Sequence, residues 1–401
     1  MRKIKIANLV EFLFLTLAFG IGANLCAQPK PKPTPDAAPT PVLETNMRTR
    51  TTQVKGITPK TQVELDAAVK LAQDGKYDES IHALTKIIKA YPNLALAYNN
   101  RGYAYSQLDQ LDLAVADFNQ SLKLSPSSFA YDNRGAAFLK KGDLTKALAD
   151  MSEAIKLNPQ ASLSYSNRAA VYIRMEDFQS ALADQNKAIS IAPKEASYLS
   201  NRCYTNQKLN LLEQALKDCN DALALSPKNA LTYGNRAAIY LQLSNFESAL
   251  SDYDAAIKFG GDASYTYFNR GFALINLNRP QEAVESFTKA IATRPPSAMV
   301  YLHRAKAYEK LNQPESELAD YNKAIEVEPT NAVAYNNRGI YYFKRAEKNA
   351  ALADFNKAIE LNPKMVLAYR NRALFYRQTG EIEKAQADEK TAAEIQTAPP
   401  K

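Results

Sequence analysis

Asparagine recurs in this sequence at positions where its side-chain amide could form hydrogen bonds along one line. The pattern Asn-Arg followed by Gly, Ala or Cys appears eight times, at a spacing of 33 residues once and 34 thereafter, and a histidine fills the one gap. The series consists of Asn100, Asn133, Asn167, Asn201, Asn235, Asn269, His303, Asn337 and Asn371. Because an amide donates and accepts at once, it can pair with the C=O and N–H groups of a peptide of any sequence.

Residues suited to catalysis or metal binding are scarce. His82 and His303 are the only histidines, so a histidine-based metal cluster or a Ser-His-Asp relay lacks its central members. No glycine-rich phosphate loop is present, and the carboxylates recur at helical spacing without singling out a glycosidase-type pair. We therefore predict that the chain is not an enzyme and that it holds no metal and no cofactor.

Two cysteines, Cys203 and Cys219, follow the N-terminal segment, and both fall at expected core positions of one repeat. A disulfide between facing helices is one interpretation, because the chain has features of an exported protein. Two buried free thiols are the favoured interpretation, because cysteine packs well as a small apolar residue.

The elements that must position these residues follow from the period. A fixed period of 34 residues means that one supersecondary unit is stacked on copies of itself. Small residues at the eighth and twentieth positions of each unit would let two helices approach closely, a large residue at the twenty-fourth would fill the gap, and proline at the thirty-second would end the pair. Ten such units begin at Thr61, Ala95, Ser128, Ser162, Ala196, Ala230, Ser264, Ala298, Ala332 and Val366.

The recurring Tyr, Gly/Ala, Tyr, Ala, Phe and Pro of residues 61 to about 397 resemble the tetratricopeptide repeat family. The resemblance implies an all-α fold, an α-solenoid superhelix of about ten antiparallel helix-turn-helix repeats. Two departures stand out, because the usual Trp at the fourth position is Tyr and the usual Leu at the seventh is Arg. Neither departure changes the expected fold.

Arginine at the seventh position is usually accompanied by aspartate sixteen residues later, as in Arg236 and Asp252. In a hairpin that turns near the fifteenth residue, the seventh and twenty-third positions lie at the same height. We therefore expect a structural ion pair within or between neighbouring hairpins, in which the carboxylate offsets the desolvation of a partly buried guanidinium. Arg270 is the exception, since it faces Ser286.

The resemblance also implies a function. In similar repeat proteins the sixth position faces the concave groove. The eight asparagines and His303 at this position, here called the Asn ladder, are therefore expected to bind an extended polypeptide of a protein or peptide partner. Apolar residues nearby would form pockets for its side chains, namely Tyr103, Phe129, Tyr204, Tyr265 and Phe272. The alternative for all these residues is architectural: they pack successive hairpins, and each Asn bonds its own scaffold.

The expected function is thus that of a non-enzymatic scaffold for protein–protein interactions. One alternative is a structural component of an envelope complex that assembles through the convex face or the solenoid ends. Another is an accessory subunit that presents substrate to a separate enzyme. The eighth unit breaks the pattern with His303, Lys306 and Glu317, which mark either a specialised pocket or local drift.

The N-terminal segment resembles a secretory signal. Arg2, Lys3 and Lys5 precede an apolar run, and residues 1–27 are predicted to be a signal peptide that is cleaved after Ala27. The alternative is lipidation at Cys26. The protein is therefore expected to be exported, to a periplasmic or secreted location. Residues 28–60 are rich in proline and are predicted to form a flexible spacer before the repeats of 61–397 and a short tail, 398–401.

Charge argues against nucleic-acid binding. The net charge of +8 includes +2 on the signal segment and +4 on the spacer, which leaves +2 on residues 61–401. A nearly neutral repeat region lacks the basic surface that phosphate backbones require, so no nucleic-acid partner is expected. The basic spacer suits either a solvated linker, which is favoured, or a peripheral association with the envelope.

Overall fold

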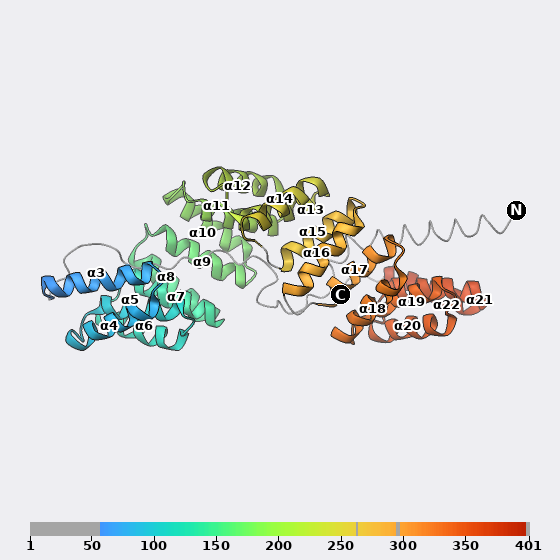
Figure 1. Ribbon diagram of the computed structural model, residues 1–401, viewed down its shortest axis with the longest axis horizontal. Helices are drawn as coiled ribbons and strands as arrows, with labels where there is room; N and C mark the ends of the chain where they lie inside the picture. The colour runs from blue at the N-terminus through green and yellow to red at the C-terminus, as the bar shows by residue number, and fades with distance from the viewer. Residues whose placement is uncertain (1–56, 262–263, 294–296, 398–401) are drawn as a thin grey trace. The chain divides into compact units, whose positions relative to one another are not determined.

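The computed structural model describes residues 57–261, 264–293 and 297–397 (Figure 1). Within these ranges the chain forms twenty α-helices and no strand. The predicted signal peptide, the spacer up to residue 56 and the tail lie outside the described residues. No described helix is both long enough and apolar enough to cross a membrane.

The helices form ten hairpins, each with a first and a second helix. The first helices are α3 (Pro59–Gln73), α5 (Ala95–Gln107), α7 (Ser128–Lys141), α9 (Ser162–Arg174), α11 (Ala196–Lys208), α13 (Ala230–Gln242), α15 (Ser264–Asn276), α17 (Ala298–Lys310), α19 (Ala332–Lys344) and α21 (Val366–Thr379). The second helices are α4 (Tyr77–Ala90), α6 (Leu111–Leu124), α8 (Leu144–Leu157), α10 (Phe178–Ile191), α12 (Leu212–Leu225), α14 (Phe246–Lys258), α16 (Pro280–Thr293), α18 (Pro314–Val327), α20 (Lys348–Leu361) and α22 (Ile382–Thr397).

Each hairpin packs against the next one along the chain (Figure 1). A second helix contacts the first helix that follows it, and successive first helices also touch, as α11 and α13 do. The core therefore runs through the stack as a series of local clusters between neighbouring hairpins. This arrangement confirms the predicted all-α solenoid.

A left-handed residue ends the first helix of every hairpin, always at the fifteenth position of the unit. Glycine occupies it only in Gly75, Gly142 and Gly380. The other seven are Asp109, Glu176, Asn210, Ser244, Asn278, Asn312 and Ala346, with φ between 54° and 61°. The next N–H then bonds a carbonyl five residues back, as from Asp143 to Phe138 at 2.9 Å. Seven non-glycine residues accept an unfavourable backbone conformation because the packed hairpin requires it.

Within a hairpin, the two helices approach most closely at the eighth and twenty-fourth positions. A side chain on Gly271 would have its Cβ only 2.7 Å from the ring of Phe287, and one on Gly339 would lie 2.8 Å from Phe355. Both rings are fully buried. The predicted packing of a large residue on one helix against a small residue on the other is therefore confirmed.

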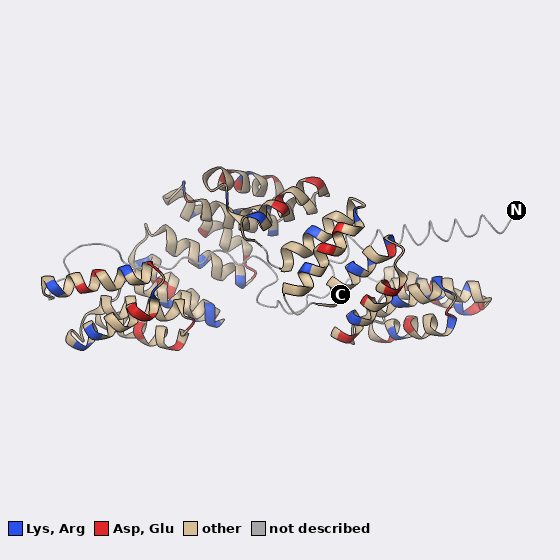
Figure 2. Cartoon of the chain, viewed as in Figure 1, with Lys and Arg blue, Asp and Glu red and all other residues tan. Residues whose placement is uncertain are grey.

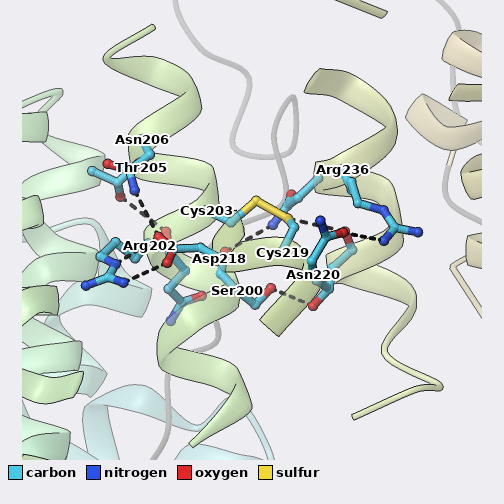
Figure 3. Close-up of a disulfide and its surroundings, with 12 residues drawn as sticks. Ser200, Arg202, Cys203, Thr205, Asn206, Asp218, Cys219, Asn220 and Arg236 are labelled. Atoms are coloured by element: carbon cyan, nitrogen blue, oxygen red, sulfur yellow. Dashed lines mark hydrogen bonds and ion pairs between the residues drawn. A yellow bond between two sulfur atoms is a disulfide. The ribbon is translucent and has the colours of Figure 1, made fainter. Parts of the chain in front are cut away.

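In the fifth hairpin these same two positions hold Cys203 and Cys219, which form a disulfide between α11 and α12 (Figure 3). The favoured prediction of free thiols is thus wrong. Both side chains are fully buried, and their Cα atoms lie 5.4 Å apart, within the span that a disulfide bridges. In other hairpins the close approach of the two helices packs an aromatic ring against glycine. In this hairpin it brings two sulfur atoms together.

The predicted Arg–Asp ion pair forms within the hairpin. In eight units the guanidinium Nε and Nη2 donate to the two carboxylate oxygens at 2.6–2.9 Å. The aspartates keep only 4–9% of their side-chain surface exposed and the arginines 16–23%. The hydrogen bonds that Arg236 donates to Asp252 raise the pKa of this arginine above its usual value, so it stays charged.

Two further contacts complete this ion pair. The remaining Nη1 donates to the twenty-fifth residue of the preceding hairpin, as Arg236 does to Asn220 at 2.7 Å. In seven of the eight units an aromatic ring at the fourth position and another at the eleventh lie 5.5–6.0 Å from the guanidinium carbon. The fifth hairpin has no such rings, and there Asn206 donates to Asp218 at 2.9 Å (Figure 3).

Breaking one ion pair tests its role. Arg236→Leu or Asp252→Leu alone should lower the free energy of unfolding by about 3–5 kcal/mol, because each leaves an uncompensated buried charge. The double variant should cost less than either single change, because no charge is then buried. Urea denaturation followed by circular dichroism measures all three. A double variant as unstable as the worse single variant would contradict the pairing.

Candidate functional site

The nine side chains of the Asn ladder fall into two groups. Six of them are buried, with 0–7% of their surface exposed: Asn100, Asn133, Asn167, Asn201, Asn235 and Asn371. The other three, Asn269, His303 and Asn337, are half-buried, and they belong to the seventh, eighth and ninth hairpins in succession. The ladder side chains are therefore buried along most of the stack and partly exposed on α15, α17 and α19, which we call the open part of the ladder.

Three of the six buried asparagines bond neighbouring first helices to one another. Asn133 donates to the side-chain oxygen of Asn99 at 3.2 Å, and Asn371 donates to that of Asn336 at 2.8 Å. Asn235 donates more weakly, to the backbone carbonyl of Ser200 at 3.4 Å. These contacts match the architectural alternative, and a ligand would reach the six amides only if the first helices separated.

The apolar residues predicted to flank the ladder are also placed unequally. Tyr204 is buried, with 8% of its surface exposed. Tyr103 and Phe129, in the second and third hairpins, are half-buried but lie beside closed parts of the ladder. Tyr265 and Phe272 are half-buried on α15, next to its open part. The structure therefore does not gather the five into one pocket.

A set of partly exposed side chains remains on α15, α17 and α19. Its residues occupy the second, sixth and ninth positions, which share one side of a helix because they are four and three residues apart. We call it the α15–α19 face, and it consists of Asn269, Phe272, Met299, His303, Lys306, Asn337 and Ile340. Met299 is its most exposed apolar member, at 41%.

His303 lies among three aromatic rings. The ring centres of Phe268, Phe272 and Phe287 are 5.2, 5.7 and 6.0 Å from that of the imidazole. Burial lowers the pKa of His303 to about 4, because the charged form loses its hydration. The side chain is therefore uncharged near neutral pH and contributes a flat, largely apolar surface to the face.

Charged groups lie beside His303 at the junction of the eighth and ninth hairpins. Glu309 accepts from Lys306 at 2.5 Å and from Lys344 at 2.6 Å. Glu317, which replaces a small residue, is 4% exposed and lies 3.5 Å from Arg345 Nη2. Burial, with a smaller contribution from Glu309, raises the pKa of Glu317 to about 7. Lys306 and Glu317 thus belong to one connected cluster rather than to two independent departures.

Sequence reasoning missed Glu309 and Lys344, since they occupy variable positions near the ends of the first helices. The spacing of three residues between Lys306 and Glu309 is the one signal that could have indicated their contact. Elsewhere the charges of both signs are interspersed along the hairpins (Figure 2). Within the described ranges, no group of three or more His, Cys, Asp or Glu side chains is arranged to hold a metal ion.

Comparison with known families supports the repeat assignment. Three sequence profiles, each of the tetratricopeptide repeat, match the chain. They match residues 95–128 and 332–365, residues 128–161 and 264–297, and residues 163–195 and 299–331, and together they cover half of the chain. No curated protein matches the sequence.

The chain is similar to several solved structures. A chain of the APC/C hetero-tetramer Cut9–Hcn1 is 13% identical, with 78% of this chain and 63% of that chain covered and a TM-score of 0.53. A tetratricopeptide repeat protein from Parabacteroides merdae is 22% identical, with coverages of 65% and 98% and a TM-score of 0.46. YrrB, described as having an unusual peptide-binding site, is 22% identical, with coverages of 46% and 95% and a TM-score of 0.42. By its repeated sequence, its matched profiles and its stacked hairpins, the chain belongs to the tetratricopeptide repeat family.

Proposed function

We propose that this protein is a scaffold that binds an extended segment of another protein along the α15–α19 face. Proteins of this repeat family generally serve as interaction scaffolds, and the fold is typically non-catalytic. The observation that carries the proposal is the succession of Asn269, His303 and Asn337 on three adjacent hairpins, each half-buried where six equivalents are buried. Only here does the ladder keep side-chain surface for a ligand.

The chemistry of the face suits a polypeptide. Asn269 and Asn337 can each donate to a peptide carbonyl and accept from a peptide N–H. Phe272, Met299 and Ile340 offer apolar surface between them for alternate side chains of an extended strand. With hairpins about 10 Å apart and about 3.3 Å per extended residue, three hairpins span about nine residues of ligand.

The two amides can be tested directly. A display library of random peptides of about ten residues is selected on the full chain, and the affinities of the selected peptides are measured by fluorescence polarisation. Asn269→Ala with Asn337→Ala should weaken binding at least tenfold, because two pairs of hydrogen bonds are lost. Gln281→Ala with Asn349→Ala, on the exposed surfaces of α16 and α20, is the matched control and should leave affinity unchanged. Equal affinities in both double variants would place the site elsewhere.

The ionisation of His303 can be tested through stability. Its pKa is about 4 in the folded chain against an ordinary value of 6.5, so the unfolded chain takes up the proton first as the pH falls. The free energy of unfolding is therefore highest, as far as His303 is concerned, above pH 6.5, and it falls as the pH decreases toward 4. Relative to His303→Phe, which keeps an aromatic ring in place, the protein should lose about 3 kcal/mol over this range. Urea denaturation at several pH values measures the difference, and parallel curves for the two proteins would contradict the assignment.

We also propose that the protein is exported. The basic and apolar pattern of residues 1–27 supports this, and so does the disulfide between Cys203 and Cys219, because structural disulfides persist in oxidising compartments. The intact mass of the protein from its native host should correspond to a chain that begins at Gln28. A mass that includes Met1, or one for a chain that begins at an acylated Cys26, would contradict cleavage after Ala27.

A further inference from the structure

The seventh hairpin lacks the ion pair on which the other hairpins after the first rely. Ser286 occupies the twenty-third position, where eight units have aspartate. Asp254 occupies the twenty-fifth position of the preceding hairpin, where the residue that contacts the arginine of those eight units is Asn, Thr or Ser. The eleventh position also changes, from the usual ring to Leu274. Three departures thus surround a single guanidinium, that of Arg270.

Arg270 makes fewer hydrogen bonds than its equivalents. Its Nε donates to Asp254 Oδ1 at 2.6 Å, and its Nη1 donates to the hydroxyl of Ser286 at 2.6 Å. Ser286 in turn donates to the carbonyl of Glu282 at 2.9 Å. No group among the described residues accepts from Nη2, the atom that donates to Asp Oδ1 in each of the eight complete pairs. The side chain is nevertheless only 21% exposed.

A cavity of about 170 Å³ lies at this place, between α14, α15 and α16. Arg270, Ser286, Lys289, Tyr267 and Asp254 line it, with Glu285 also in its wall. Ser286 is shorter than aspartate, and the guanidinium is turned so that Nε donates to Asp254 and Nη1 donates to Ser286. Lys289 lies over the ring of Tyr267, 5.5 Å from its centre, and brings a second positive charge to the cavity.

We propose that the Arg270 cavity binds a carboxylate group supplied by another molecule. The carboxylate would accept from Nη2 of Arg270 and pair with Lys289. A guanidinium matches a carboxylate in shape and charge, and in each of the eight complete pairs Nη2 donates to a carboxylate oxygen. The site is separate from the α15–α19 face, because the seventh position points away from the second, sixth and ninth.

The charge balance sets the expected strength. Asp254 and Glu285 offset Arg270 and Lys289, so the cavity has no net positive charge and attracts its ligand through directed hydrogen bonds. A free carboxylate should therefore bind in the millimolar range. The same group on the side chain or C-terminus of a protein segment should bind more tightly, because neighbouring contacts add to it.

The full chain is titrated with sodium acetate, and the arginine side-chain N–H signals are followed by NMR, with Arg270→Lys used to assign the signal. Acetate should shift the Arg270 signal saturably, whereas sodium chloride or phosphate at equal ionic strength should not. Ser286→Asp supplies the chain's own carboxylate, as in eight other hairpins, and should weaken acetate binding at least tenfold. No saturable shift in the wild type, or an equal response to phosphate, would overturn the proposal.

A converse variant provides the control. Asp252→Ser removes the carboxylate from the complete pair of Arg236 and should create a second acetate-responsive arginine signal. The source of the natural ligand is then distinguished with N-acetylglutamate amide and with short peptides that end in a free carboxylate. Tenfold tighter binding of either than of acetate assigns the cavity to a protein segment, and equal binding assigns it to a small carboxylic acid. An unchanged acetate response in Ser286→Asp would place the anion elsewhere and sink the assignment.

Discussion

The bidentate hydrogen bond between arginine and aspartate is the interaction on which this solenoid depends. It joins the seventh residue of a first helix to the twenty-third residue of its second helix, and its third donor reaches the hairpin before it. A guanidinium and a carboxylate that are largely removed from water are costly unless their hydrogen-bonding groups are satisfied. Here the requirement is met only when two helices and the neighbouring hairpin hold one relative position, so the pair specifies the stack as well as stabilising it.

The rest of the backbone adjusts to that position. The chain reverses at the fifteenth residue in a left-handed conformation in every hairpin, including the first and seventh, which lack the pair but pack in the same way. Ala346 and Glu176 adopt this conformation although it is unfavourable for residues with a side chain. Packing therefore overrides local preference at the turn, and the turn residue can vary without loss of the hairpin.

Sequence reasoning could predict features that depend on spacing along the chain. The period placed the ten hairpins, and the interval of sixteen residues placed the Arg–Asp pair, because both follow from one repeated reversal. The accessibility of the asparagines could not be predicted in this way. Asn133 and Asn269 occupy the same position in the repeat, yet one is buried and the other is half-buried, because their exposure depends on how closely neighbouring first helices approach. That distance depends on side chains from several hairpins and leaves no periodic signal.

Several departures from the repeat lie in the seventh to ninth hairpins, in addition to those of the first and fifth, and they concern different interactions. On α15, Asn269 belongs to the open part of the ladder, while the adjacent Arg270 pairs with Asp254 of the preceding hairpin instead of with an aspartate of its own. Consecutive residues of a helix point about 100° apart, so these two changes affect different sides of the same hairpin. The hairpins keep their fold where these interactions change, because each is also held by packing against its neighbours. Single positions can therefore diverge toward recognition while most units serve as framework.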